Sequence, residues 1–194
     1  MEDKYSSRFE FIEDEILREN IAITFRYIHF LALISKKNDY PDFPSISYSI
    51  YKDMIVNTGS IIESCLHFCL QKYFETNKAK SSEVMPYEWK NSKCVSIYEI
   101  IPSESEVCGI IRHKKPEKLN ELTQFKTVNN ACKNAEILDE KLYEKAEFIR
   151  AKRNNIHLSA LTKTDDFYTE EDTKKVFAYA KEILTNIKTK LQSL

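Results

Sequence analysis

Glycine is scarce in this chain, which has only 2 glycines among 194 residues, and its prolines number only 5. Glycine reaches positive φ angles at little energetic cost, so its scarcity excludes collagen-like chains, glycine-rich linkers and glycine-rich phosphate-binding loops. Few tight turns are available, and long helices are expected. The content of 42% hydrophobic and 30% charged residues is typical of a folded protein and excludes a disordered chain. The length predicts one domain over residues 1–194.

The chain also lacks an excess of one charge and a long apolar run. Its 29 basic and 30 acidic residues give a net charge of −1, so contact with nucleic acid requires a local basic surface. The longest apolar-rich stretch, 21–34, is too short to span a bilayer, and the acidic first residues do not form a signal peptide. The 5 scattered cysteines are typical of reduced thiols. These features predict a soluble cytoplasmic protein without membrane contact.

Hydrophobic periodicity predicts an all-α fold, a bundle of about five helices. Apolar side chains recur every three, four or seven residues in segments at about 7–36, 47–74, 119–132, 139–156 and 169–191. The helical pattern is lost at 76–116, where two short β-rich runs flank a polar turn. We interpret this segment, between the second and third helices, as a small insertion that forms a β-hairpin or irregular structure.

Capping residues and one glycine add local predictions. Ser7 with Glu10, Asp139, and Thr169 with Asp172 are expected to cap the first, fourth and fifth helices. Gly59, inside the second helix, is expected to mark close packing of another helix. The apolar stripe of the first helix, expected to face the core, consists of Phe9, Ile12, Ile16, Ile23, Tyr27, Phe30 and Ile34.

Several kinds of catalytic site have no sequence support. Cys65 and Cys69 lie one helical turn apart, but a metal site needs two more ligands, and His67 lies about 200° around the helix from Cys65. We therefore interpret these cysteines as small buried apolar residues. There is no Gly-x-Ser-x-Gly nucleophile motif. No metal ion or other cofactor is expected.

One segment, 148–158, carries an unusual set of polar residues. On a helix, Arg150, Arg153, Asn154 and His157 follow the i, i+3, i+4, i+7 rule and share one face. Two permanent cations depress the pKa of a neighbouring histidine and gain nothing from it. An anion bound between these groups would resolve the conflict, whereas the simpler interpretation is an exposed basic helix face.

The spacing from Arg150 to His157 resembles the Arg-x(4–6)-His signature of HEPN domains, helical proteins many of which are ribonucleases. The segment 59–66, which contains Glu63, resembles the second helix of that superfamily, and 125–158 resembles the helix pair that leads into its motif. The resemblance implies a metal-independent endoribonuclease of defence or toxin type. The site that it implies comprises His157, Arg150, Arg153 and Asn154 as catalytic residues, with Lys152 and Glu63 binding the substrate.

The chemistry of RNA cleavage suits these residue types. RNA carries its own nucleophile, the 2′-OH, so cleavage needs a base, an acid and donors that stabilise charge on the phosphate. His157 serves as base or acid, and the motif arginine is either Arg150 or Arg153. Asn154 hydrogen-bonds the phosphate or holds His157 in one tautomer. The expected products are a 2′,3′-cyclic phosphate and a 5′-OH.

Partners and alternative functions follow from the same residues. Each chain supplies one such histidine, so the second proton-transfer role falls to water or to a second copy. A two-fold homodimer would place two motifs face to face, and we expect a homodimer that binds RNA. The toxin interpretation also allows an antitoxin partner. The alternatives are a non-catalytic HEPN-like module that binds RNA, a nucleotide or a protein, and a helical scaffold unrelated to that superfamily.

Overall fold

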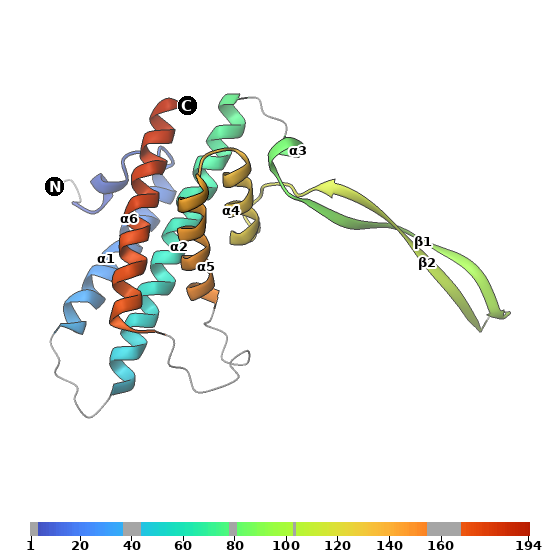
Figure 1. The fold of residues 1–194 in the computed structure, drawn as a ribbon, viewed down its shortest axis with the longest axis horizontal. Helices are drawn as coiled ribbons and strands as arrows, with labels where there is room; N and C mark the ends of the chain where they lie inside the picture. The colour runs from blue at the N-terminus through green and yellow to red at the C-terminus, as the bar shows by residue number, and fades with distance from the viewer. Residues whose placement is uncertain (1–3, 37–43, 78–80, 103, 155–167) are drawn as a thin grey trace.

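The computed structural model describes residues 4–36, 44–77, 81–102, 104–154 and 168–194 (Figure 1). His157 therefore lies outside the described residues. The elements in chain order are the 3-10 helix η1 (Ser6–Phe9), α1 (Glu15–Ser35), α2 (Pro44–Asn77), α3 (Ser81–Val84), β1 (Tyr87–Ile101), β2 (Ser105–Pro116), α4 (Phe125–Asn134), α5 (Glu140–Asn154) and α6 (Glu170–Ser193).

The predicted all-α class with about five helices is wrong. The described part of the chain contains six α-helices and a two-stranded antiparallel sheet, so helices and strands are mixed. The strands are 15 and 12 residues long, far longer than a small insertion requires. Valine, isoleucine and tyrosine favour extended backbone throughout these strands, and the intervening lysines and serines mask their alternation. The extra helix, α3, has only 4 residues, too few to show a helical period.

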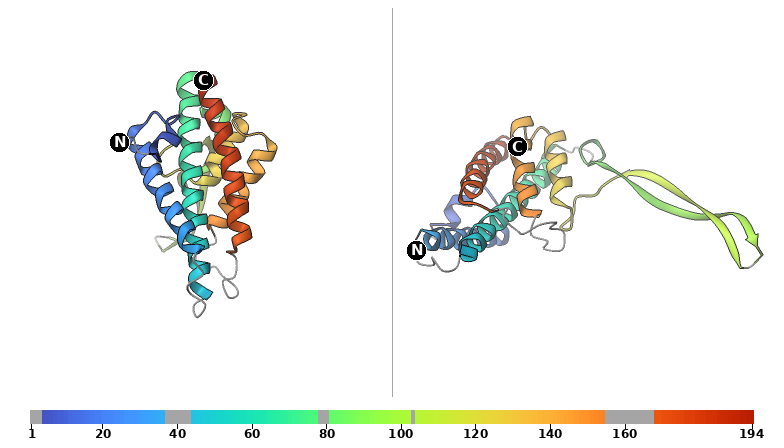
Figure 2. Two further views of the ribbon diagram at one scale, coloured as in Figure 1. Left: turned by 90° about the vertical axis from the view of Figure 1, so that its left-hand side faces the viewer. Right: turned by 60° about the horizontal axis from the view of Figure 1, so that its bottom comes forward.

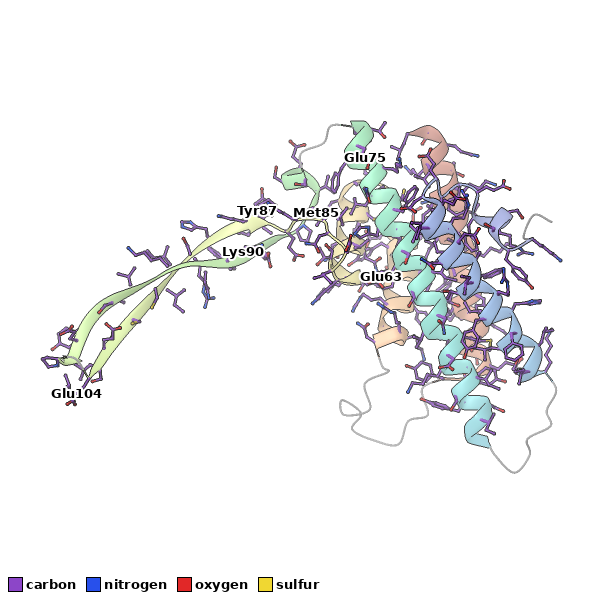
Figure 3. The ribbon with its side chains drawn as sticks, turned by 180° about the vertical axis from the view of Figure 1, so that it is seen from behind. Glu63, Glu75, Met85, Tyr87, Lys90 and Glu104 are labelled. Atoms are coloured by element: carbon purple, nitrogen blue, oxygen red, sulfur yellow. The ribbon has the colours of Figure 1, made fainter. Side chains whose placement is uncertain are left out.

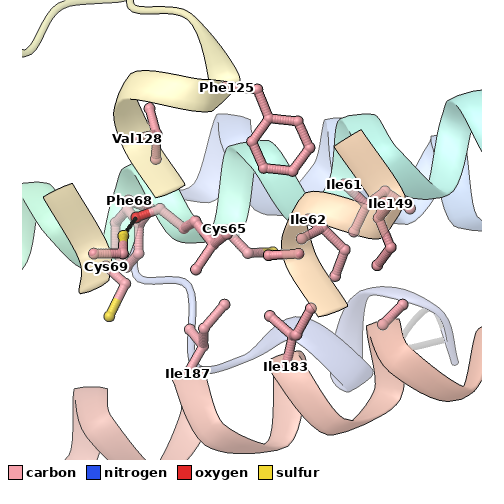
Figure 4. Close-up of a cluster of buried hydrophobic side chains, with 14 of the residues drawn as sticks. Ile61, Ile62, Cys65, Phe68, Cys69, Phe125, Val128, Ile149, Ile183 and Ile187 are labelled. Atoms are coloured by element: carbon pink, nitrogen blue, oxygen red, sulfur yellow. Dashed lines mark hydrogen bonds between the residues drawn. The ribbon is translucent and has the colours of Figure 1, made fainter. Parts of the chain in front are cut away.

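Helix α2 is the centre of the helical body. It contacts α1, α4, α5 and α6, and Figure 2 shows these helices gathered around it. Apolar side chains from four helices meet at its buried face (Figure 4). The fully buried members include Ile62 and Leu66 of α2, Val128 of α4, Ile149 of α5, and Ile183 and Ile187 of α6. Each such side chain contributes roughly 1.5–3 kcal/mol to folding.

The cysteines of this core behave as apolar residues, as expected from the sequence. Cys65, Cys69 and Cys132 are buried. Burial raises the pKa of the Cys65 and Cys69 thiols to about 12, so both remain protonated at neutral pH. The neutral thiols pack as small apolar side chains in the core.

The start of the first helix differs from the prediction. Ser7 lies in η1, where its hydroxyl donates to the Lys4 carbonyl, and α1 begins only at Glu15. The cap is Asp14, whose carboxylate accepts a hydrogen bond of 2.9 Å from the backbone N–H of Leu17. The predicted capping box of Ser7 and Glu10 is therefore wrong. The negative charge of the Asp14 carboxylate also interacts favourably with the positive end of the helix dipole.

The predicted inner stripe of α1 is also largely wrong. Its residues Ile16, Ile23, Tyr27 and Phe30 are exposed, with Ile16 reaching 76%. A second apolar face packs against α2 instead, and it consists of Ile21, Ala22, Ile28 and Leu31. Both faces satisfy a helical period, so periodicity alone does not select the one that is buried.

Three other local predictions are confirmed. Asp139 accepts a hydrogen bond of 2.8 Å from the N–H of Leu142 at the start of α5. Thr169 accepts one of 3.1 Å from the N–H of Asp172 and caps α6. Gly59 lies against α5, as expected for a glycine at a close helix contact. None of the described helices is long and apolar enough to cross a membrane.

Candidate functional site

A surface groove of about 740 Å³ brings most of the predicted site residues together. It lies where α4 and α5 meet α2, and Figure 3 shows Glu63 on the side of α2 that faces these two helices. Its walls include Glu63, Ser64 and His67 of α2, residues 121–124, Phe125 and Lys126 of α4, and Arg150, Arg153 and Asn154 of α5. One apolar residue of α1, Leu17, completes it.

Arg153 connects α5 to α2 within this groove. Its Nη1 forms an ion pair of 2.9 Å with Oε2 of Glu63, and its guanidinium lies 5.9 Å from the centroid of the Phe125 ring. The absence of a side chain at Gly59 makes room for Arg153, because a Cβ there would lie 3.1 Å from Cδ of Arg153. Three residues from two other helices therefore fix the position of this guanidinium.

Arg150 is held from its own helix. Its Nε lies 2.9 Å and 3.0 Å from the two carboxylate oxygens of Glu147, and its Nη2 lies 2.7 Å from Oε2. The fully buried Asn129 of α4 donates to the same carboxylate at 2.7 Å. Burial alone would raise the pKa of the Glu147 carboxyl, but the hydrogen bonds from Arg150 and Asn129 outweigh it and lower that pKa. Glu147 thus stays ionised and orients Arg150.

Glu63 also pairs with an arginine, but the pKa of its carboxyl is raised, unlike that of Glu147. Its side chain is mostly covered, and burial raises the pKa of its carboxyl despite the opposing effects of Arg153 and His67. Glu63 therefore takes up a proton at a higher pH than an exposed glutamate does. That protonation would weaken the hold of α2 on Arg153.

Asn154 and Lys152 lie on the same helix, but only Asn154 faces the groove. Asn154 lines the groove, one residue beyond Arg153. Lys152 does not line it, because its Nζ forms an ion pair of 2.9 Å with Asp172 at the start of α6. The predicted substrate contact of Lys152 is therefore not supported by its position. His157, the fourth member of the predicted face, falls outside the described residues.

His67 is a groove residue that the sequence interpretation missed. Its Nε2 lies 3.0 Å from the carbonyl oxygen of Asn120, in the segment before α4. A carbonyl only accepts hydrogen bonds, so Nε2 carries the proton and Nδ1 is the acceptor of the neutral ring. The spacing of four residues from Glu63 puts both side chains on one face of α2. The sequence pattern places His67 away from the face of Cys65 but does not show that Asn120 and α4 lie beside it.

The chemistry available in the groove is that of oriented cations and an imidazole. Three cations, Lys126, Arg150 and Arg153, stand against two carboxylates of the lining, Glu63 and Glu121. Two guanidiniums present planar donors that match phosphate or carboxylate oxygens. Within the described ranges, no three His, Cys, Asp or Glu side chains come together as metal ligands.

The comparisons with known proteins add no relative to this description. No protein-family model, curated protein or solved structure matches the chain. The similarity to HEPN domains therefore depends on the residues of the 59–66 and 125–158 segments alone.

Proposed function

We propose that this groove binds and cleaves RNA, making the protein a metal-independent endoribonuclease related to HEPN domains. The observation that carries the proposal is the convergence of Arg150, Arg153 and Asn154 from α5 with His67 from α2 on one groove. These are the group types that phosphodiester cleavage through a 2′-OH requires. A cytoplasmic location and a defence or toxin role belong to the same proposal, as does an antitoxin partner.

The two arginines are suited to stabilising charge on the phosphate. Arg153 contacts Glu63 through one terminal nitrogen, and a guanidinium carries five N–H groups in a rigid fork. The ion pairs with Glu63 and Glu147 fix both guanidiniums before a ligand arrives. Such prior orientation reduces the reorganisation that charge stabilisation would otherwise cost.

Two imidazoles share the proton transfers in this proposal. His67 stands in the groove, and His157 follows Asn154 by three residues in the sequence. One ring removes the 2′ proton and the other protonates the leaving 5′ oxygen, since the reference pKa of histidine lies near neutral pH. One chain then supplies both roles, and the chemistry does not require a second copy.

A second candidate function is a non-catalytic module that binds RNA, a nucleotide or a protein. The observation that favours it is the pairing of both arginines with carboxylates, which leaves the groove with little excess positive charge. In this case the ion pairs stabilise the packing of α5, and the groove binds a ligand without reacting with it.

A cleavage assay with histidine variants distinguishes the two functions. Purified protein is incubated with labelled RNA in excess chelator, as wild type and as His67→Ala, His157→Ala and His29→Ala. We expect the first two variants to lose about 10²–10⁴-fold in rate, the usual contribution of a general acid or base. His29 lies on α1 outside the groove, where its Nδ1 is hydrogen-bonded to the hydroxyl of Tyr5; its variant is the matched control and should keep the wild-type rate. Binding without cleavage by the wild type would instead support the second candidate.

A further inference from the structure

The two strands form an arm that projects from the helical body and exposes many apolar side chains. In the arm, Ile97 and Tyr98 are both 67% exposed, and neither strand packs along its length against a helix (Figures 1 and 2). An isolated two-stranded ribbon is at best marginally stable in water, and contiguous exposed apolar surface marks an interaction site. The arm therefore needs a partner.

One face of the arm carries most of the exposed apolar side chains of its distal part, whereas Ile110, which pairs with Cys94, lies on the opposite face. Residues directly opposite in an antiparallel pair share a face, as do residues two apart on one strand. Ile97 belongs to the apolar face because its Cδ1 lies over Gly109, where it would be 2.7 Å from an added Cβ. A register shift between Ser96 and Tyr98 brings Tyr98, which is opposite Val107, onto the same face. The resulting surface, here called the arm strip, consists of Val95, Ile97, Tyr98, Ile101, Val107 and Ile111.

Charge is segregated along the arm. The base, residues 87–93 and 112–116, carries five cations and one carboxylate: Lys90, Lys93, Arg112, Lys114, Lys115 and Glu88. The distal part, 94–111, carries three carboxylates and no lysine or arginine: Glu99, Glu104 and Glu106. The positive base of one arm is therefore complementary to the negative tip of a second arm that runs in the opposite direction.

We propose that the arm pairs antiparallel with the arm of a second copy of this chain, arm strip against arm strip. A two-fold axis across the middle of the arms places each acidic tip beside the basic base of the other copy. A parallel pairing would instead oppose like charges. RNA bound along the arm would occupy the base only, leave the arm strip exposed and be repelled by the tip.

This pairing has a consequence for the groove. A strand of 15 residues spans about 50 Å, so the helical bodies lie at opposite ends of the paired arms. The α5 helices of the two copies then do not face each other, unlike the dimer expected from the sequence. The arm pairing is independent of the proposed function, because it involves no groove residue.

Charge-swapped variants test the pairing by sedimentation of the full chain at micromolar concentration. The tip variant is E99K/E104K/E106K, and the base variant is K90E/K93E/K114E. Each alone should dimerise roughly tenfold or more weakly than wild type, because tip and base then carry like charge. An equimolar mixture should recover the dimer as a hetero-pair, which native mass spectrometry identifies. E10K/E144K/E171K, on exposed body positions, is the matched control and should dimerise like wild type.

Any of three results would overturn the proposal. The wild type could remain monomeric at about 100 μM, the two variants could dimerise as tightly as wild type, or their mixture could fail to recover the dimer. If the base variant loses RNA affinity while no form dimerises, the arm is an RNA-binding element instead. Tyr98→Asp, an exposed position of the arm strip, should weaken dimerisation roughly tenfold while the far-ultraviolet circular dichroism stays unchanged.

Discussion

Arg153 of α5 lies directly against Gly59 of α2, with the Cβ of Arg153 only 3.2 Å from the position a Cβ would take at residue 59. The guanidinium of Arg153 forms an ion pair with Glu63, which lies one helical turn beyond Gly59 on α2. Because Gly59 has no side chain, Arg153 of α5 can cross the surface of α2 and reach the carboxylate of Glu63. The close packing of α5 against α2 at Gly59 therefore places Arg153 in the groove beside Glu63.

Gly59→Ala should leave stability nearly unchanged and reduce RNA cleavage. Alanine favours the helix by about 1 kcal/mol, but the added methyl group crowds Arg153 at a comparable cost. Arg153 must shift, and its ion pair with Glu63 weakens. The measurements are urea unfolding and cleavage rate, with Ser60→Ala as a control on the same helix. A variant that is more stable by the full helix preference and cleaves normally would show that the position of Arg153 is unimportant.

Glu147→Gln should destabilise the protein more at neutral pH than in acid. The pKa of the Glu147 carboxyl is lowered in the folded state, so its contribution is present above its ordinary value of 4.5 and is lost as pH falls through the folded-state pKa. We expect a loss of up to about 1 kcal/mol in unfolding free energy near pH 7, because the pair is partly exposed, and a loss that shrinks as the pH falls below 4.5. Urea unfolding at several pH values measures it. A loss that is constant with pH would contradict the ionised role, and Glu144→Gln is the exposed control on α5.

The two arginine variants should identify the motif arginine. Arg150→Ala and Arg153→Ala should each cost on the order of 2–4 kcal/mol in transition-state stabilisation, measured as the ratio of kcat/KM values. The larger loss marks the arginine that contacts the reacting phosphate. Lys152→Ala is the matched control, because Lys152 lies on α5 but pairs with Asp172 outside the groove. Equal losses from all three variants would indicate that α5 acts only through general stability.

Features set by neighbouring residues could be predicted from the sequence. Asp139 and Thr169 cap their helices through hydrogen bonds that span three residues, so the chain pattern contains the whole interaction. The burial of Cys65 and Cys69 follows similarly from their positions on one apolar helix face. The grouping of Arg150, Arg153 and Asn154 also follows from the helical period.

Features set by distant residues could not be predicted. Helix α1 carries two apolar faces, and only contact with α2 decides that Ile28 is buried and Ile23 is exposed. Arg153 and Glu63 are 90 residues apart in the sequence, so the sequence does not show that the carboxylate offsets the charge of the guanidinium. His67 enters the groove for the same reason, since the groove exists only when α4 and α5 pack against α2.

The chemical groups at the cleaved ends of an RNA substrate test the proposed ribonuclease activity. A labelled RNA oligonucleotide is cleaved under single-turnover conditions in excess chelator, beside the same oligonucleotide with a 2′-deoxy nucleotide at the cleavage position. Cleavage through the 2′-OH predicts a 2′,3′-cyclic phosphate and a 5′-OH from the RNA, detected by mass spectrometry, and no cleavage of the deoxy-substituted strand. Cleavage of the deoxy-substituted strand, products with a 5′-phosphate, or binding of RNA without any cleavage would contradict it.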